Sequence, residues 1–89
     1  MTDTTIYFWT DRIGRAYVTL RQRAGHWQIA WGHRDPPGGD NYMEQGKHET
    51  SVQDEAVRRT LDHIRALSEE PGEESRVAAA LQEAMRSAA

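Results

Sequence analysis

Five arginines and three large aromatic residues fall within residues 12–34 of this chain, a segment with no Asp or Glu. The arginines are Arg12, Arg15, Arg21, Arg23 and Arg34, and the aromatic residues are Tyr17, Trp27 and Trp31. Guanidinium groups donate paired hydrogen bonds to phosphates and to guanine edges. The segment therefore predicts a surface that receives an anionic partner.

Alternation along this segment sorts its side chains onto two faces of a sheet. The apolar face holds Ala16, Val18, Leu20, Trp27, Ile29 and Trp31, and the polar face holds Arg15, Tyr17, Thr19, Arg21, Arg23, His26 and Gln28. We expect the nucleic-acid contacts to be Arg15, Tyr17, Arg21, Arg23, Gln28 and Arg34. The competing interpretation is that these arginines are merely hydrated residues on the exposed side of a sheet and bind no partner. The two tryptophans are expected in the core rather than stacked on a ligand.

The elements that must position these residues form an α+β fold. Strands are expected over residues 5–10, 15–23 and 26–32, with a short fourth strand over 41–45. Thr50 is expected to cap a helix that runs to Leu67, with Gln53 completing the cap. We therefore predict a three- or four-stranded antiparallel sheet packed on one helix, followed by a C-terminal Ala-rich helix.

The domain organisation follows from these elements and from length, since 89 residues suffice for one small domain. Residues 1–67 form the sheet and its covering helix, and residues 68–73 form an acidic Pro-Gly linker. Residues 74–89 form the last helix, which either docks on the sheet or makes a homodimer contact.

Charge and composition narrow the function classes. The net charge is −3, and all of it comes from residues 66–89, which hold two Lys+Arg and five Asp+Glu. This balance argues against indiscriminate coating of nucleic acid. The chain has no cysteine, which excludes disulfides and thiolate chemistry. Because no signal peptide or membrane-spanning run is evident, we expect a cytoplasmic protein without membrane contact.

Catalytic and cofactor motifs are missing from the sequence. The four histidines lack the spacing of a helical zinc site, and no serine elbow or phosphate loop is present. We therefore expect a non-catalytic binding protein with no metal and no cofactor. The Glu pairs at 69–70 and 73–74 are interpreted as solvated charge.

A family resemblance supports the binding interpretation. Residues 21–29 (Arg-Gln-Arg-Ala-Gly-His-Trp-Gln-Ile), Arg34-Asp35, Gly38-Gly39, Tyr42-Met43 and Glu55-Ala56 resemble the AP2/ERF pattern and are similar also to the arm-binding domains of phage integrases. The resemblance covers residues 13–66. It implies major-groove recognition of DNA by Arg15, Arg21, Arg23 and Arg34 on the sheet, in a small phage or mobile-element regulator.

The alternative is a protein-binding inhibitor or adaptor, such as a phage-encoded anti-CRISPR-type inhibitor of a host defence complex. Its partner would be a protein or a nucleoprotein complex. The first strand either is buried on both sides or exposes one pair of side chains, and exposed Tyr7 and Trp9 would form a protein-binding hot spot. The carboxylates of Glu69, Glu70, Glu73 and Glu74 would occupy a nucleic-acid channel.

Overall fold

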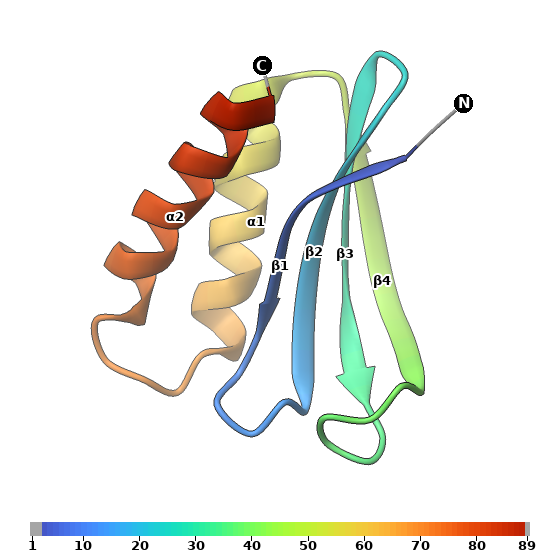
Figure 1. Ribbon diagram of the computed structural model, residues 1–89, viewed down its shortest axis with the longest axis vertical. Coiled ribbons are helices and arrows are strands. Elements are labelled where there is room, and N and C mark those ends of the chain that lie inside the picture. Colours follow the sequence, from blue (N-terminus) through green and yellow to red (C-terminus); the bar gives the residue numbers. More distant parts are fainter. Residues whose placement is uncertain (1–2, 89) are drawn as a thin grey trace.

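The computed structural model describes residues 3–88, which form four strands followed by two helices (Figure 1). The strands are β1 (Thr4–Thr10), β2 (Ala16–Arg23), β3 (His26–Arg34) and β4 (Tyr42–Thr50), and the helices are α1 (Gln53–Leu67) and α2 (Glu73–Ala88). The predicted α+β class is confirmed. Among these residues, no helix is long and apolar enough to cross a bilayer.

The sheet is an antiparallel meander in the order β1-β2-β3-β4. Gly14 and Gly25 occupy turns at opposite ends of the sheet with φ angles of 78° and 80°, which residues with a side chain rarely adopt. The predicted short strand over 41–45 is wrong in extent, because β4 continues to Thr50. An irregular register beside Gly32 lets β4 remain paired with β3 beyond the predicted end.

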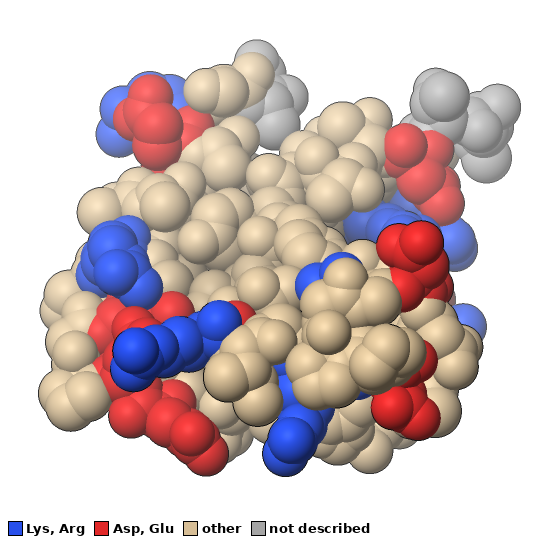
Figure 2. Space-filling model, turned by 60° about the horizontal axis from the view of Figure 1, so that its bottom comes forward, with Lys and Arg blue, Asp and Glu red and all other residues tan. Residues whose placement is uncertain are grey.

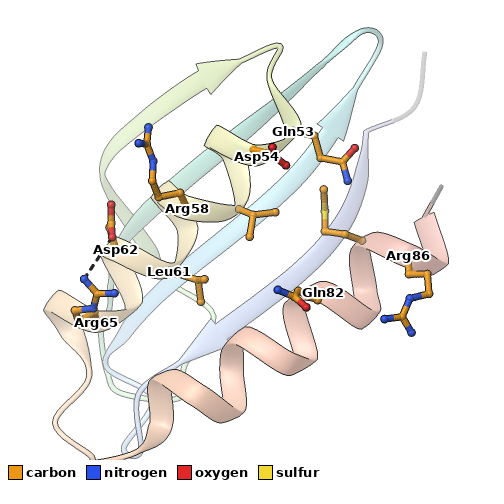
Figure 3. Close-up of a pocket in the computed structure, with 10 residues that line it drawn as sticks. Gln53, Asp54, Arg58, Leu61, Asp62, Arg65, Gln82 and Arg86 are labelled. Carbon is orange, nitrogen blue, oxygen red and sulfur yellow. Dashed lines mark ion pairs between the residues drawn. The ribbon is translucent and has the colours of Figure 1, made fainter.

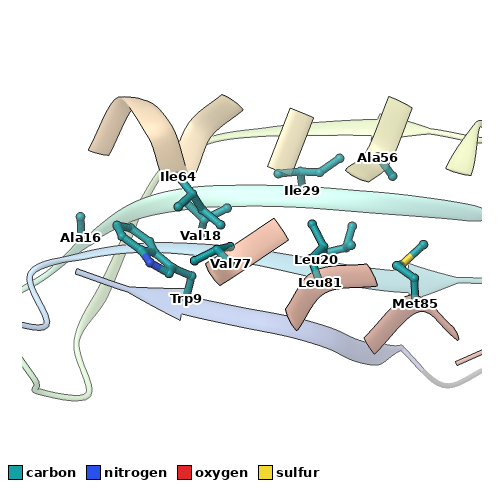
Figure 4. Close-up of a cluster of buried hydrophobic side chains, with 10 residues drawn as sticks. All are labelled: Trp9, Ala16, Val18, Leu20, Ile29, Ala56, Ile64, Val77, Leu81 and Met85. Atoms are coloured by element: carbon teal, nitrogen blue, oxygen red, sulfur yellow. The ribbon is translucent and has the colours of Figure 1, made fainter. Parts of the chain in front are cut away.

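Both helices lie on one side of the sheet and leave the other side open (Figure 1). The core between the layers is the apolar face predicted from alternation, joined by residues of both helices (Figure 4). Val18, Leu20 and Ile29 are fully buried there, opposite Ile64 of α1 and other helical side chains. Period-2 alternation therefore separates a covered face from a face that remains available to a ligand.

The tryptophans of β3 pack against this core, as predicted, although each is only half-buried. The indole of Trp31 stacks on His63 of α1, with ring centroids 3.7 Å apart. On β4 it faces Gly46, where an added Cβ would lie 2.5 Å from the indole. Trp31 thus fills the space between sheet and helix and is not a ligand platform.

The alternative of an exposed Tyr7 and Trp9 pair is wrong. Trp9 is only 4% exposed and belongs to the core, and Tyr7 is half-buried against it. The reason is α2, which contacts β1 on the helical side of the sheet. The aromatic side chain that β1 exposes is instead Phe8, on the open face, where it is 43% accessible.

The start of α1 also differs from the prediction. Thr50 ends β4, and its hydroxyl accepts a hydrogen bond from the Val52 backbone N–H at 3.1 Å. Val52 occupies the N-cap position without a side-chain cap and is 56% exposed, so it is not part of the apolar stripe. The buried stripe of α1 consists of Ala56, Thr60 and Ile64.

The Ala-rich helix docks on the sheet. Val77, Leu81 and Met85 of α2 are buried in the common core, so its apolar stripe is already covered within one chain. Glu73 begins this helix and is itself buried. Its carboxylate accepts a hydrogen bond from the Trp9 indole N–H at 3.1 Å, which ties α2 to β1.

Candidate nucleic-acid interface

A groove of about 470 Å³ lies on the open face of the sheet. Its cause is a row of paired residues that crosses all four strands: Phe8, Thr19, Ala30 and Lys47. The two central residues are small and the two outer ones are large. The middle of the open face is therefore hollow, and the larger side chains of the neighbouring rows stand around it.

One end of the groove is a wall of three aromatic rings, contributed by Phe8, Tyr17 and Tyr42. Phe8 and Tyr17 are nearly parallel with centroids 6.4 Å apart, and Tyr42 meets Tyr17 edge-on at 5.2 Å. The strand between the two tyrosines contributes Gly32, so no side chain separates them. Phe8 and Tyr42 remain 43% and 46% exposed, whereas Tyr17 beneath them is only 5% exposed.

Burial raises the pKa of the Tyr17 phenol, and the nearby carboxylate of Glu44 raises it further. The hydroxyl of Tyr17 therefore stays protonated at neutral pH. The aromatic wall is uncharged, which suits contact with a planar apolar surface.

The cations that line the groove are Arg21 and Arg23 at the other end and Lys47 in the central row, where it is paired with Ala30. Arg23 is compensated, because its guanidinium pairs with Asp3 at 3.0 Å and lies 3.8 Å from Glu49. Among residues 3–88, Arg21 and Lys47 form no ion pair. Both are exposed, so an anion that enters the groove meets two uncompensated charges.

A polar floor completes the groove. Gln28 is 6% exposed and lines the groove, and its amide makes no hydrogen bond to another described residue. A primary amide both donates and accepts hydrogen bonds. The polar atoms of the Gln28 amide are not buried, so they are open to the groove and can hydrogen-bond to a ligand there.

Across residues 3–88, the cations of the helices are paired with carboxylates, whereas most cations of the sheet and its loops are not. Each arginine of α1 and α2 has a carboxylate within 4.0 Å; these are Arg58, Arg59, Arg65, Arg76 and Arg86. In the strands and loops before α1, the described cations without a carboxylate partner among residues 3–88 are Arg12, Arg15, Arg21, Arg34 and Lys47. The uncompensated positive charge therefore belongs to the sheet.

Four of the six predicted contact residues line the groove, namely Tyr17, Arg21, Arg23 and Gln28. Arg15 and Arg34 do not line it. Arg34 is half-buried, donates to the Gly39 carbonyl at 3.0 Å, and holds its guanidinium carbon 5.0 Å from the centre of the Tyr42 ring. It therefore supports the aromatic wall from behind. Arg15 is exposed at the β1–β2 turn, where its backbone N–H is bonded to Asp11.

The groove residues that sequence reasoning did not predict as contacts include Phe8, Tyr42 and Lys47. Phe8 was overlooked because every residue from 6 to 9 is apolar, so alternation could not tell its two faces apart. Lys47 was missed because β4 was predicted to end at residue 45, and the face of Tyr42 was not assigned. The register shift between Trp31 and Gly32 places both on the open face, whereas strict alternation would place residues 42 and 47 on opposite faces.

The carboxylates of the alternative binding surface are mostly engaged within the chain. Glu73 is only 8% exposed and accepts hydrogen bonds from Trp9, Ser68 and Arg76, so its interpretation as solvated charge is wrong. Glu74 pairs with Arg65, and Glu70 lies 3.8 Å from Arg76. Glu69 is exposed.

Two further depressions offer less to a charged ligand. A groove of about 590 Å³ between α1 and α2 has an apolar floor of Val57, Leu61 and Met85, but its arginines are paired with carboxylates (Figure 3). At the end that carries the α1–α2 linker, acidic and basic side chains are interspersed (Figure 2). There Arg12 shares a depression with Asp11 and three glutamates of residues 69–73.

Within residues 3–88, no group of three His, Cys, Asp or Glu is placed to hold a metal ion. Comparison with protein-family models, with curated proteins and with solved structures finds no match to this chain.

Proposed function

We propose that this protein binds nucleic acid through the open face of its sheet, without catalysis. The observation that carries the proposal is the unequal charge pairing: arginines of the helices are neutralised by carboxylates, whereas Arg21 and Lys47 on the open face are not. Uncompensated cations beside exposed aromatic rings are a common arrangement for contact with phosphates and bases.

The charge distribution of the protein favours contact with nucleic acid at one site over coating of nucleic acid by the whole surface. Three cations and one carboxylate, Glu44, line the groove, whereas the chain as a whole carries −3. The open face attracts phosphates locally while the rest of the surface repels them. Affinity should therefore depend on correct seating in the groove, with weak nonspecific binding elsewhere.

The proposal is tested by titrating labelled single-stranded and duplex DNA with the protein at two salt concentrations. With phosphates on Arg21 and Lys47, the logarithm of affinity should fall with the logarithm of salt with a slope of about −1.4, at about −0.7 per contact for single strands. Arg21→Glu should abolish binding.

Arg58→Glu is the matched control, because it makes the same charge change on α1, on the other side of the sheet. It should leave most of the affinity intact. Equal losses in the two variants would mean that only net charge matters and would overturn the proposed interface. Absence of salt-dependent binding to either DNA would overturn the function itself.

A further inference from the structure

We infer that the open-face groove is a seat for one unpaired nucleotide: its base lies against Phe8 and Tyr42, and its phosphate lies at Arg21 and Lys47. The inference rests on the proposed function and names the class of nucleic acid that the same face takes. The ligand is a nucleoside phosphate with an unpaired base. It is either one nucleotide of a single strand or a free nucleotide.

The volume of the groove agrees with such a ligand. Sites for small ligands have volumes of about 300–1,000 Å³, and this groove has about 470 Å³. Its ends differ chemically in the same way as the two ends of a nucleotide. An aromatic wall stands at one end and Arg21 at the other, while Lys47 lies between them in the row that contains Ala30.

Gln28 offers such a ligand a polar contact, because the polar atoms of its amide reach the surface of the groove. It sits on the floor of the groove, paired across the sheet with Arg21, and is more than nine-tenths buried. Its amide has no hydrogen-bond partner among residues 3–88. The Watson–Crick edge of an unpaired base carries both donors and acceptors, so it would satisfy this amide.

The sheet is too wide for the duplex recognition that the family resemblance implies. Four strands at spacings of about 4.8 Å measure about 14 Å between the outer strand axes, before side chains are added. The major groove of B-DNA is only about 12 Å wide. Half-exposed aromatic rings lie on both edge strands. In a duplex the faces of the bases are covered by stacking, whereas the face of an unpaired base is free to stack on such a ring.

Four ligands test the inference: a labelled oligothymidylate, an abasic strand of the same length, a blunt duplex, and free thymidine monophosphate as competitor. The protein should bind oligothymidylate about 5- to 150-fold more tightly than the abasic strand, which keeps the phosphates but lacks the bases. The blunt duplex should bind more weakly than oligothymidylate.

Tyr42→Leu removes the ring and keeps an apolar side chain of similar bulk. It should lower affinity for oligothymidylate by a similar factor and leave affinity for the abasic strand unchanged, whereas Tyr42→Trp should restore binding. Phe8→Leu provides a second variant on the opposite edge strand, and near-UV circular dichroism of each variant checks the fold.

The outcomes separate the two proposals. Equal binding of the abasic strand, or tighter binding of the duplex, would overturn the nucleotide seat while leaving nucleic-acid binding through Arg21 intact. Saturable binding of thymidine monophosphate without binding of any strand would support the seat and overturn the proposed function. If no ligand binds, both proposals are wrong.

Discussion

Replacing Glu73 with alanine tests how the helices are held on one side of the sheet. Glu73 is the first residue of α2 and is 8% exposed. Its carboxylate accepts hydrogen bonds from the Trp9 indole at 3.1 Å, from Arg76 at 3.2 Å and from the Ser68 hydroxyl. The contact joins β1 to α2 across 64 residues of sequence.

The expected loss of stability is the sum of three modest contributions. The buried indole N–H of Trp9 loses its acceptor, which costs about 1–3 kcal/mol. The pair with Arg76 contributes only about 0–1 kcal/mol, because that arginine is 69% exposed. A carboxylate in the first turn of a helix adds about 0.3–1 kcal/mol. These contributions sum to about 1–5 kcal/mol, so Glu73→Ala should destabilise the protein by about 3 kcal/mol.

Urea unfolding followed by tryptophan fluorescence measures this loss, and thermal unfolding gives a second readout. The melting temperature should fall by roughly 10–25 °C, at about 4–8 °C per kcal/mol for a domain of this size. Glu69→Ala is the matched control: Glu69 lies in the same linker, is exposed, and forms no ion pair with residues 3–88. It should change stability by less than about 0.5 kcal/mol.

A double-mutant cycle with Trp9→Phe isolates the indole–carboxylate hydrogen bond. Trp9→Phe removes the N–H donor together with part of the indole ring, and the cycle subtracts this packing loss, so the coupling energy should be about 1–2 kcal/mol. A Glu73→Ala variant as stable as Glu69→Ala, or a coupling energy near zero, would refute the structural role assigned to this carboxylate.

Two further predictions concern the sheet and its contact with α1. Gly32→Ala should destabilise the protein by at least about 3 kcal/mol, because the new Cβ would lie 2.2 Å from the Met43 carbonyl oxygen. Gly25→Ala is the control, because its Cβ would meet no atom within 4 Å although its φ is 80°. It should lower the free energy of unfolding by only about 1 kcal/mol. Equal urea midpoints for the two variants would contradict the proposed clash. Burial lowers the pKa of His63 below its ordinary 6.5, so this residue contributes stability above about pH 6.5 that is lost as pH falls through the folded pKa. Urea midpoints measured between about pH 8 and about pH 5 should decline less in His63→Phe than in wild type, and parallel declines would exclude His63 as the cause.

The sequence alone determined which residues share a face wherever polar and apolar residues alternate. The polar side of residues 15–23 became the open face, and Val18, Leu20 and Ile29 became the core. The α+β class was equally readable, because short turns force antiparallel pairing and an apolar helical stripe must cover one face of the sheet.

The tertiary structure decided which face a side chain takes where local alternation does not, and which charged residues are paired. In the apolar run from Ile6 to Trp9, both faces are hydrophobic, so only the docking of α2 made Trp9 core and Phe8 surface. The convergence of Phe8, Tyr17 and Tyr42 required three strands to come together. Whether a given arginine is neutralised depends on carboxylates distant in sequence, as with Arg23 and Asp3. Periodicity specifies direction within one strand, whereas contacts between strands and helices depend on packing of the whole chain.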